Sequence, residues 1–353
     1  MRKSISILAM AAAVLCSCDK NADCVPCEEP QETGTLAVSL LFDEGAQTKA
    51  VTSYTTSQTY EKQVNKVQIF VFDESGKINI YKDAGTTQSG IAISTTTGKK
   101  TVWAVVNGPD LSGVSSLSEL EDTALDLAAN STAAATGFVM AGSTSCTVSA
   151  TAATANVSVS RLVARVALQR VTNQLPDGYG ALTIENVVLT NVVGNQNIAG
   201  DAAAATWYNK MGRKDGATES SQIIDGATNK ASCEALTFKS VGQSVNHGAN
   251  LTISTPYMFY SYPNSNAAGS TGWVNPFTAR ASRLVVTATI DGVKYYYPVT
   301  LDKKLERNKA YTVEMTITGL GSTDPDEPIV KGSFTASITV QDWVAGESYD
   351  EIL

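Results

Sequence analysis

The sequence predicts an all-β protein made of two successive antiparallel β-sandwich domains. The chain of 353 residues is long enough for two or three domains, and its 43% of hydrophobic residues supply a sizeable core. It is rich in Thr and Val, which favour half-buried strands, and in Gly and Asn, which favour turns. Short stretches of alternating apolar and polar residues recur in two blocks, and turn-forming residues end each stretch.

The charge balance argues against nucleic-acid binding. The sequence has 26 Lys and Arg residues against 34 Asp and Glu residues, which gives a net charge of −8, and it contains no large basic block. Nucleic acids and anionic membrane surfaces both require clustered basic residues. We therefore expect no nucleic acid among the partners.

Residues 1–17 have the pattern of a bacterial secretory signal peptide. A basic start precedes the apolar run ISILAMAAAVL, which is too short to span a membrane. Leu15, Ser17 and Cys18 match a lipoprotein signal-peptidase box that ends at the acylated cysteine. Cys16 fits less well, because Leu15 would then precede it directly. The sequence thus predicts lipidation of Cys18, which would attach the precursor to a membrane. The alternative is an ordinary cleaved signal peptide.

A polar tether over residues 18–33 leads to the first predicted strand. Residues 35–42, TLAVSLLF, alternate strictly, so this strand has one buried face. The buried face consists of Leu36, Val38, Leu40 and Phe42.

Lys49 follows this strand as an isolated basic residue. It is the only Lys or Arg between Lys20 and Lys62, so the bond between Lys49 and Ala50 is the one trypsin-type site in that stretch. The alternative interpretation is a solvated loop lysine.

Further strands and one short helix complete the first domain, which we predict over residues 34–172. Residues 67–72 place three aliphatic side chains on one face and two phenylalanines on the other, so this strand is expected to be buried on both faces. The turn DESG (73–76) predicts a hairpin. A Ser116–Glu119 capping pair and leucine spacing predict a helix over residues 115–128. The other strands are expected at 77–81, 101–109, 138–143, 146–150 and 156–171.

Residues 173–353 are predicted to form the second domain. Asp291-Gly292 between two strand patterns is a strong hairpin signal. Residues 194–250 are expected to be mainly long loops, and residues 321–332 a solvated linker. The strands are expected at 181–193, 251–263, 283–291, 293–301 and 309–319.

The last predicted strand, SFTASITVQDW over residues 333–343, repeats the alternation of the first one. Phe334, Ala336, Ile338 and Val340 share one of its faces. The simplest interpretation is an ordinary last strand of the second sandwich.

No pattern in the sequence predicts catalysis, a metal site or a cofactor. The one histidine, His247, lies in a Gly- and Asn-rich loop, which argues against a catalytic triad or a multi-histidine zinc site. Asp324, Asp326 and Glu327 lack the rest of a calcium site, so we interpret them as part of the solvated linker. Tyr295–Tyr297 are consecutive in a strand and alternate between its faces, so they form no sugar-stacking platform.

The remaining cysteines are less informative. Cys24 and Cys27 form a CxxC in the polar tether, without the strand–helix context of a redox or metal site. Cys146 and Cys233 are far apart in the sequence, which leaves both a disulfide and two free thiols open.

Several of these stretches together resemble the fimbrillins, the subunits of the type V fimbriae of Bacteroidales. Each stretch is short, but their order and spacing span most of the chain. They are the lipobox ending at Cys18, KVQIFVFDESGKI (66–78), VWAVVNGP (102–109), FVMAGS (138–143) with SRLVARVAL (160–168), and ERNKAYTVEMTITGLGSTDPDEP (306–328) with QDW (341–343).

The resemblance implies two transthyretin-like sandwich domains and a precursor held at the outer membrane through lipid on Cys18. In this family a trypsin-like protease cuts after the first strand of the N-terminal domain, here between Lys49 and Ala50, and that strand leaves. A C-terminal segment of a neighbouring subunit then fills the groove and the fibre grows. The expected partners are therefore other fimbrial subunits, in a homopolymer, and the processing protease.

The residues are compatible with such an exchange. Residues 35–42 and 333–340 each place four apolar side chains at alternate positions, so one strand can substitute for the other in one groove. The contact is head to tail and does not close, which gives a filament. Lys49 stands where Arg is common in the family, and Ala336 is small. The protease and the extent of the donor within residues 332–353 therefore stay open.

Two other functions stay open at this point. An accessory fimbrial subunit would lack a usable donor at the tip or keep its first strand at the anchor. A surface glycan-binding lipoprotein would need an exposed aromatic platform, for which Trp207, Tyr208, Trp273 and Phe277 are the candidates.

Overall fold

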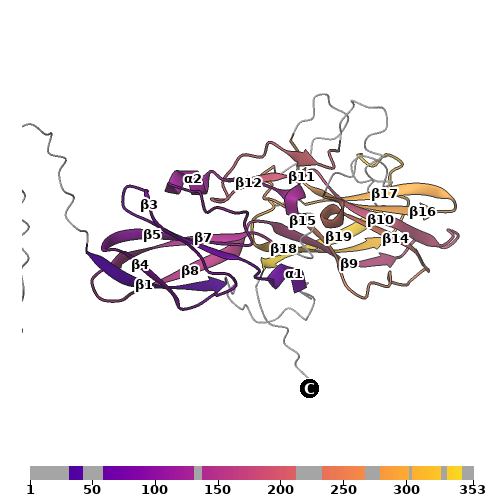
Figure 1. The fold of residues 1–353 in the computed structure, drawn as a ribbon. Coiled ribbons are helices and arrows are strands. Elements are labelled where there is room, and N and C mark those ends of the chain that lie inside the picture. The colour runs from indigo at the N-terminus through magenta and orange to yellow at the C-terminus, as the bar shows by residue number, and fades with distance from the viewer. Residues whose placement is uncertain are drawn as a thin grey trace, which may run out of the picture.

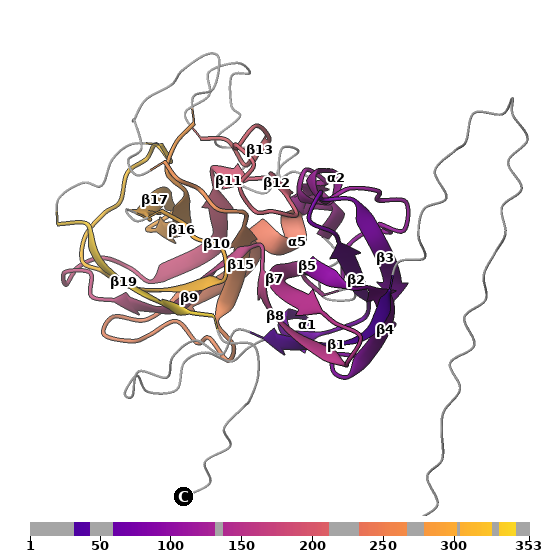
Figure 2. The same cartoon turned by 90° about the vertical axis from the view of Figure 1, so that its left-hand side faces the viewer.

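Strands dominate the computed structural model, which describes residues 32–42, 59–130, 137–211, 233–266, 279–301, 304–326 and 332–343. The prediction of an all-β protein is confirmed. The described helices are short: α1 (Thr59–Lys62), α2 (Leu117–Glu121), α5 (Glu234–Thr237) and the 3₁₀ helix η1 (Leu127–Asn130). None of them is long and apolar enough to cross a membrane. Figures 1 and 2 show an N-terminal and a C-terminal group of strands lying side by side.

The N-terminal group is one sheet of seven strands in the order β3-β2-β5-β7-β8-β1-β4. Its strands are β1 (Thr33–Phe42), β2 (Val67–Phe72), β3 (Ile78–Asp83), β4 (Ile91–Thr96), β5 (Gly98–Val106), β7 (Met140–Val148) and β8 (Ala153–Arg161). Side chains from β2 and β5 share one buried core with side chains from β1, β4 and β8, so the sheet curls around that core (Figure 2).

Strand β2 is buried on both faces, as the sequence predicts. Val67, Ile69 and Val71 belong to the core inside the curled sheet. Phe70 and Phe72 point to the other face and join the larger core that continues into the C-terminal group. The two groups of strands therefore share buried apolar surface.

Both predicted hairpins are present, and their turns use the expected residues. Asp73 accepts hydrogen bonds from the backbone N–H groups of Ser75 and Lys77, in the turn between β2 and β3. Asp291 and Gly292 have φ angles of 50° and 78° between β16 and β17. Positive φ at both central positions suits the twist of a hairpin, and Asp-Gly tolerates it.

The C-terminal group consists of two four-stranded sheets, β14-β10-β16-β17 and β15-β9-β18-β19. Buried side chains of both sheets meet in one continuous core. The strands are β9 (Ala164–Asn173), β10 (Leu182–Thr190), β14 (Phe238–Val245), β15 (Tyr257–Ser261), β16 (Arg283–Ile290), β17 (Val293–Thr300), β18 (Lys309–Ile317) and β19 (Phe334–Asp342). Two short pairs complete the strands: β11 (Val192–Val193) with β13 (Trp207–Tyr208), and β6 (Ala124–Asp126) with β12 (Asn195–Asn197).

The chain crosses from one group to the other at Leu162 and Val163. The sequence predicts one long strand over residues 156–171 and a domain boundary near residue 172. The structure instead ends β8 at Arg161, in the first sheet, and begins β9 at Ala164, in a C-terminal sheet. Both linking residues are buried, so no polar or turn residue marks the crossing in the sequence.

The helix predicted over residues 115–128 is shorter than expected. Ser116 caps α2, with its Oγ accepting from the N–H of Glu119 at 3.2 Å. The helix ends at Glu121, and the segment then pairs as β6 with β12. Leu120, Leu125 and Leu127 are all buried, which explains why their spacing resembled one longer helix.

The prediction of a solvated linker over residues 321–332 is wrong for its first half. Ser322 pairs with Tyr296 of β17. Asp326 is buried and accepts hydrogen bonds from the guanidinium groups of Arg280 and Arg283. A paired carboxylate is the form in which an aspartate tolerates burial.

Candidate functional site

Strand β1 occupies a slot between two other strands of the first sheet. On one side, residues Thr33–Val38 pair antiparallel with Ile91–Thr96 of β4. On the other side, residues Leu36–Phe42 pair parallel with Ala153–Val159 of β8. Both edges of β1 are thus used by backbone ladders, and Figure 1 shows the strand along the length of the sheet.

The predicted apolar face of β1 points into the core. Leu36 and Val38 are 0% exposed and Leu40 is 7% exposed, while Phe42 is partly buried against the same core. Fully burying three such side chains stabilises the fold by about 5 to 9 kcal/mol relative to leaving them in water. On the opposite face, Leu41 is 49% exposed. The strand therefore contributes strongly to the stability of the first sheet through one face, while its other face is open to solvent.

Strand β1 also connects its two neighbours. Strand β4 stands at the end of the strand order and has its described backbone ladder with β1 alone. Strand β8 pairs with β7 only at Ser160 and Arg161, so its ladder over residues 153–159 is with β1. Removal of β1 would leave both strands with unpaired edges and an open apolar groove, a state prone to accept another strand.

Strand β19 lies at the edge of a C-terminal sheet. It pairs antiparallel with β18 over nine positions, from Lys309↔Asp342 to Ile317↔Phe334. Among the described strands it has no second neighbour. An edge strand with one free side is the position from which a strand can most readily exchange.

The apolar face of β19 is poorly covered where it lies. Phe334 is buried at one end and contacts Tyr297 edge-on, with ring centroids 5.7 Å apart. Ile338 and Val340 are only partly buried, and Ala336 is exposed. Strand β1 therefore buries its apolar side chains more completely than β19 buries the matching set.

The other predicted site residues lie outside the described residues. These are Cys18, Lys49 and Ala50, together with the segment after Trp343. Trp273 and Phe277 of the glycan-platform alternative also lie outside them.

Trp207 and Tyr208, the remaining two residues of that alternative, form β13. Both are half-buried against the main core. The hydroxyl of Tyr208 donates to Asp126 at 2.7 Å, so its ring is held against the junction of the two groups.

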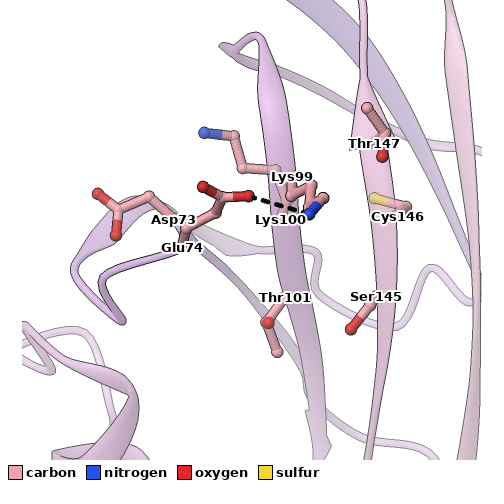
Figure 3. A pocket seen from close by; sticks show the side chains of 8 residues that line it. All are labelled: Asp73, Glu74, Lys99, Lys100, Thr101, Ser145, Cys146 and Thr147. Carbon is pink, nitrogen blue, oxygen red and sulfur yellow. Dashed lines mark ion pairs between the residues drawn. The ribbon is translucent and has the colours of Figure 1, made fainter.

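A polar pocket of about 370 Å³ lies on the first sheet, lined by the β2–β3 turn, β5 and β7 (Figure 3). Glu74 and Lys99 form an exposed ion pair across it at 3.6 Å. Lys100 is buried and donates to Asn79 and Thr96. Burial raises the pKa of the Cys146 thiol, so the thiol is protonated at neutral pH and is a poor nucleophile. Both lysines of the pocket therefore have polar partners.

The structure places Cys146, Cys233 and His247 outside β1, and all three are far from it in the sequence. Cys146 in β7 and Cys233, which directly precedes α5, are free thiols, and burial raises the pKa of Cys233 to about 12. His247 is exposed in the turn after β14. The described residues contain no group of three or more His, Cys, Asp or Glu side chains able to hold a metal ion.

The chain matches a known family over its N-terminal half. Residues 33–197 match the family described as "Major fimbrial subunit protein (FimA)". The resemblance to the fimbrillins predicted from the sequence is thereby confirmed. The matched stretch includes the whole seven-stranded sheet with β1 in its slot. No protein with a curated description matches the chain.

Solved structures share the fold over nearly the full chain. A protein of Bacteroides eggerthii assigned to cell adhesion has 21% identity and a TM-score of 0.61, covering 90% of this chain and 98% of its own. A fimbrilin (FimA) of Porphyromonas gingivalis W83 has 15% identity and a TM-score of 0.61, covering 90% and 99%. The tip fimbrial protein Mfa3 of Porphyromonas gingivalis, solved with a C-terminal truncation, has 14% identity and a TM-score of 0.53, covering 88% and 100%.

Proposed function

We propose that this chain is a polymerising subunit of a cell-surface fimbrium, in which β1 is removed and the β19 segment of a neighbouring copy takes its place. The proposed order is export as a lipoprotein anchored at the outer membrane through Cys18, cleavage between Lys49 and Ala50 by a trypsin-like protease, and loss of β1. The groove between β4 and β8 then receives the donor, whose apolar residues are Phe334, Ala336, Ile338 and Val340.

The observation that carries the proposal is the slot of β1. The strand is paired on both edges and buried on one face. Its two neighbours, β4 and β8, both come from the part of the chain that follows α1. Its loss would expose apolar surface and unpaired backbone together, and a strand of matching alternation restores both. The family match over residues 33–197 supports a fimbrial subunit as the setting for this exchange.

The weaker burial of β19 supports its role as the donor. In its own sheet the strand pairs on one edge only, and Ile338 and Val340 are half-buried. In the slot of β1 it would pair on both edges and bury the same side chains fully. At about 1.5–3 kcal/mol per fully buried large side chain, completing two half-burials gains about 2 kcal/mol, in addition to the second ladder.

Cleavage at Lys49 is the first step that can be tested. The purified precursor, treated with limited trypsin, is expected to show a new N-terminus at Ala50 and then a ladder of SDS-resistant oligomers. The variant Lys49→Gln should show no new N-terminus at Ala50 under the same treatment and should stay monomeric, because β1 remains covalently attached. N-terminal sequencing and unboiled SDS gels measure both results.

A matched variant separates this site from general proteolysis. Lys62 is the next basic residue in the sequence and lies at the end of α1. Lys62→Gln should be cut and should polymerise as the parent chain does. A parent chain that is cut at Lys49 and remains monomeric would contradict the polymerising role.

Release of β19 is the second testable step. Thr312 of β18 and Thr339 of β19 are register partners on the outer face of their sheet. A chain with Thr312→Cys and Thr339→Cys, oxidised to a disulfide, should be cut at Lys49 but form no ladder, because the donor cannot leave. Addition of a reductant should restore the ladder. SDS gels before and after reduction give the readout.

The single variant Thr312→Cys controls for oxidation of the native thiols. It should polymerise equally well with and without the reductant. Ladder formation by the oxidised double variant would show that another segment is the donor.

A further inference from the structure

A buried cluster of charged and aromatic side chains lies where the two groups of strands meet. It brings together α1, β8, β9, β15 and the residue that follows β19, and Figure 1 shows α1 at this junction. Each of its side chains is at most 2% exposed. The members are Glu61, Arg161, Arg165, Tyr260 and Trp343.

Arg161 connects α1 to the C-terminal end of the described residues. Its Nε donates to the backbone carbonyl of Glu61 in α1 at 2.9 Å. Its Nη1 donates to the backbone carbonyl of Trp343 at 3.0 Å. A lysine ammonium has no planar group that could donate to both carbonyls in this geometry, so the bridge depends on the guanidinium.

The ring of Trp343 covers the positive charges of the cluster. The guanidinium carbons of Arg161 and Arg165 lie 4.5 Å and 5.0 Å from the ring centroid. Tyr260 stacks on the same ring at 5.9 Å. A cation over an indole face is most strongly attracted where water is excluded. Trp343 is therefore held by its carbonyl and by its ring.

Among the described residues, the cluster has fewer negative charges than positive ones, and three of its donors lack an acceptor. Two arginines face one carboxylate, whose oxygens accept from Arg165 at 3.0 Å and from the Tyr260 hydroxyl at 2.6 Å. Arg161 Nη2, Arg165 Nε and Trp343 Nε1 have no hydrogen-bond partner among the described residues. Burial lowers the pKa of Arg161 to about 10, so it stays charged at neutral pH. Buried donors without partners cost free energy that hydration would recover. The contact between Trp343 and the two arginines is therefore one whose separation would let water satisfy these donors.

Strand β8 links the cluster to the slot of β1. Phe42, at the end of β1, pairs with Val159 of β8. Arg161 follows two residues later and ends the same strand. Because β1 supplies the ladder of β8 over residues 153–159, its departure would leave β8 paired only at Ser160 and Arg161, on β7, so the strand that positions Arg161 would lose most of its support.

We propose that these five residues form a latch that holds β19 on its own molecule until β1 has left. While β1 is in place, β8 positions Arg161, and Arg161 with Arg165 retains Trp343. After β1 leaves, β8 shifts, Trp343 is released and β19 becomes available to a neighbour. The proposal rests on the exchange of β1 for β19 described above, and it adds that one cleavage prepares the groove and the donor together.

Hydrogen–deuterium exchange over residues 334–343 tests the latch in the monomer. In the uncut parent chain, the backbone amides of β19 should exchange slowly. After the cut, at a protein concentration at which no ladder is present, exchange should become about tenfold faster or more, as expected when a desolvated cation–π contact is lost. The uncut variant Trp343→Leu should exchange as fast as the cut parent chain, and its occupied slot should keep it monomeric.

Arg161→Lys provides a second, milder variant, and Arg170→Lys is its matched control. Arg161→Lys keeps the charge and loses the double bridge, so uncut protein should show fast exchange in β19. Arg170 is an exposed arginine that pairs with Glu314, and its substitution should leave the exchange slow. Slow exchange in uncut Trp343→Leu and Arg161→Lys, or in the cut parent chain, would overturn the latch. Failure of the ladder alone, with the exchange as expected, would overturn the polymerising function and leave the latch standing.

Discussion

Replacing Val38 with Asp is expected to lower the free energy of unfolding by about 4 kcal/mol or more. Val38 is 0% exposed and lies in the middle of β1, between β4 and β8. The aspartate would have to be buried without a partner, or β1 would have to leave its slot, and either outcome removes the apolar contacts that close the curled sheet. Urea unfolding of the precursor, followed by circular dichroism, measures the loss.

Leu41→Asp is the matched control on the same strand. It introduces the same charged group three residues later, on the face where Leu41 is 49% exposed. Its effect should be within about 0.5 kcal/mol. Equal losses for Val38→Asp and Leu41→Asp would mean that β1 does not have one face in the core, so that its removal would open no apolar groove.

The slot of β1 was predictable in part because a strand alternates with period two. The pattern of residues 35–42 identified the strand and its buried face, and the pattern of 67–72 identified a strand buried on both faces. Turn chemistry was equally local, since Asp291-Gly292 fixes a hairpin through its own backbone preferences. These features depend only on residues that are close together in the sequence, so a single sequence is enough to predict them.

The neighbours of β1 could not be predicted in the same way. The pattern of residues 35–42 says which face is buried, but it does not say that β4 and β8 lie on either side. Likewise, the apolar stretch 156–171 contains no turn residue at Leu162 and Val163, where the chain changes sheets. Pairing between strands distant in sequence is decided by the whole fold.

The latch residues left only a faint signal in the sequence. Arg161 and Arg165 interrupt the apolar stretch SRLVARVAL, and an arginine in such a stretch needs a buried partner. The partner, Glu61, lies in a polar segment 100 residues before Arg161 and carries no pattern of its own. Asp326 is a second case, because the sequence around it predicts a linker and carries no sign of its buried partners Arg280 and Arg283.

The burial of Glu61 makes it the side chain whose loss should be most costly at the junction. Its carboxylate accepts hydrogen bonds from Arg165 Nη1 and from the Tyr260 hydroxyl, and the nearby Arg161 has no other carboxylate in the cluster. Glu61→Gln keeps the shape of the side chain but removes the one carboxylate that the described residues place beside these two buried guanidiniums. We expect the free energy of unfolding to fall by about 3–5 kcal/mol, as when one partner of a buried ion pair is removed. Urea unfolding is the measurement, because urea does not screen charge.

Two comparisons identify the cause of this loss. Glu74→Gln makes the same substitution in the exposed ion pair with Lys99, and it should change stability by no more than about 1 kcal/mol. Adding Arg165→Met to Glu61→Gln should recover part of the loss, because one uncompensated charge is then replaced by an apolar side chain of similar length. If the double variant is less stable than Glu61→Gln alone, the loss comes from packing around α1, and electrostatic compensation cannot be what holds the junction together.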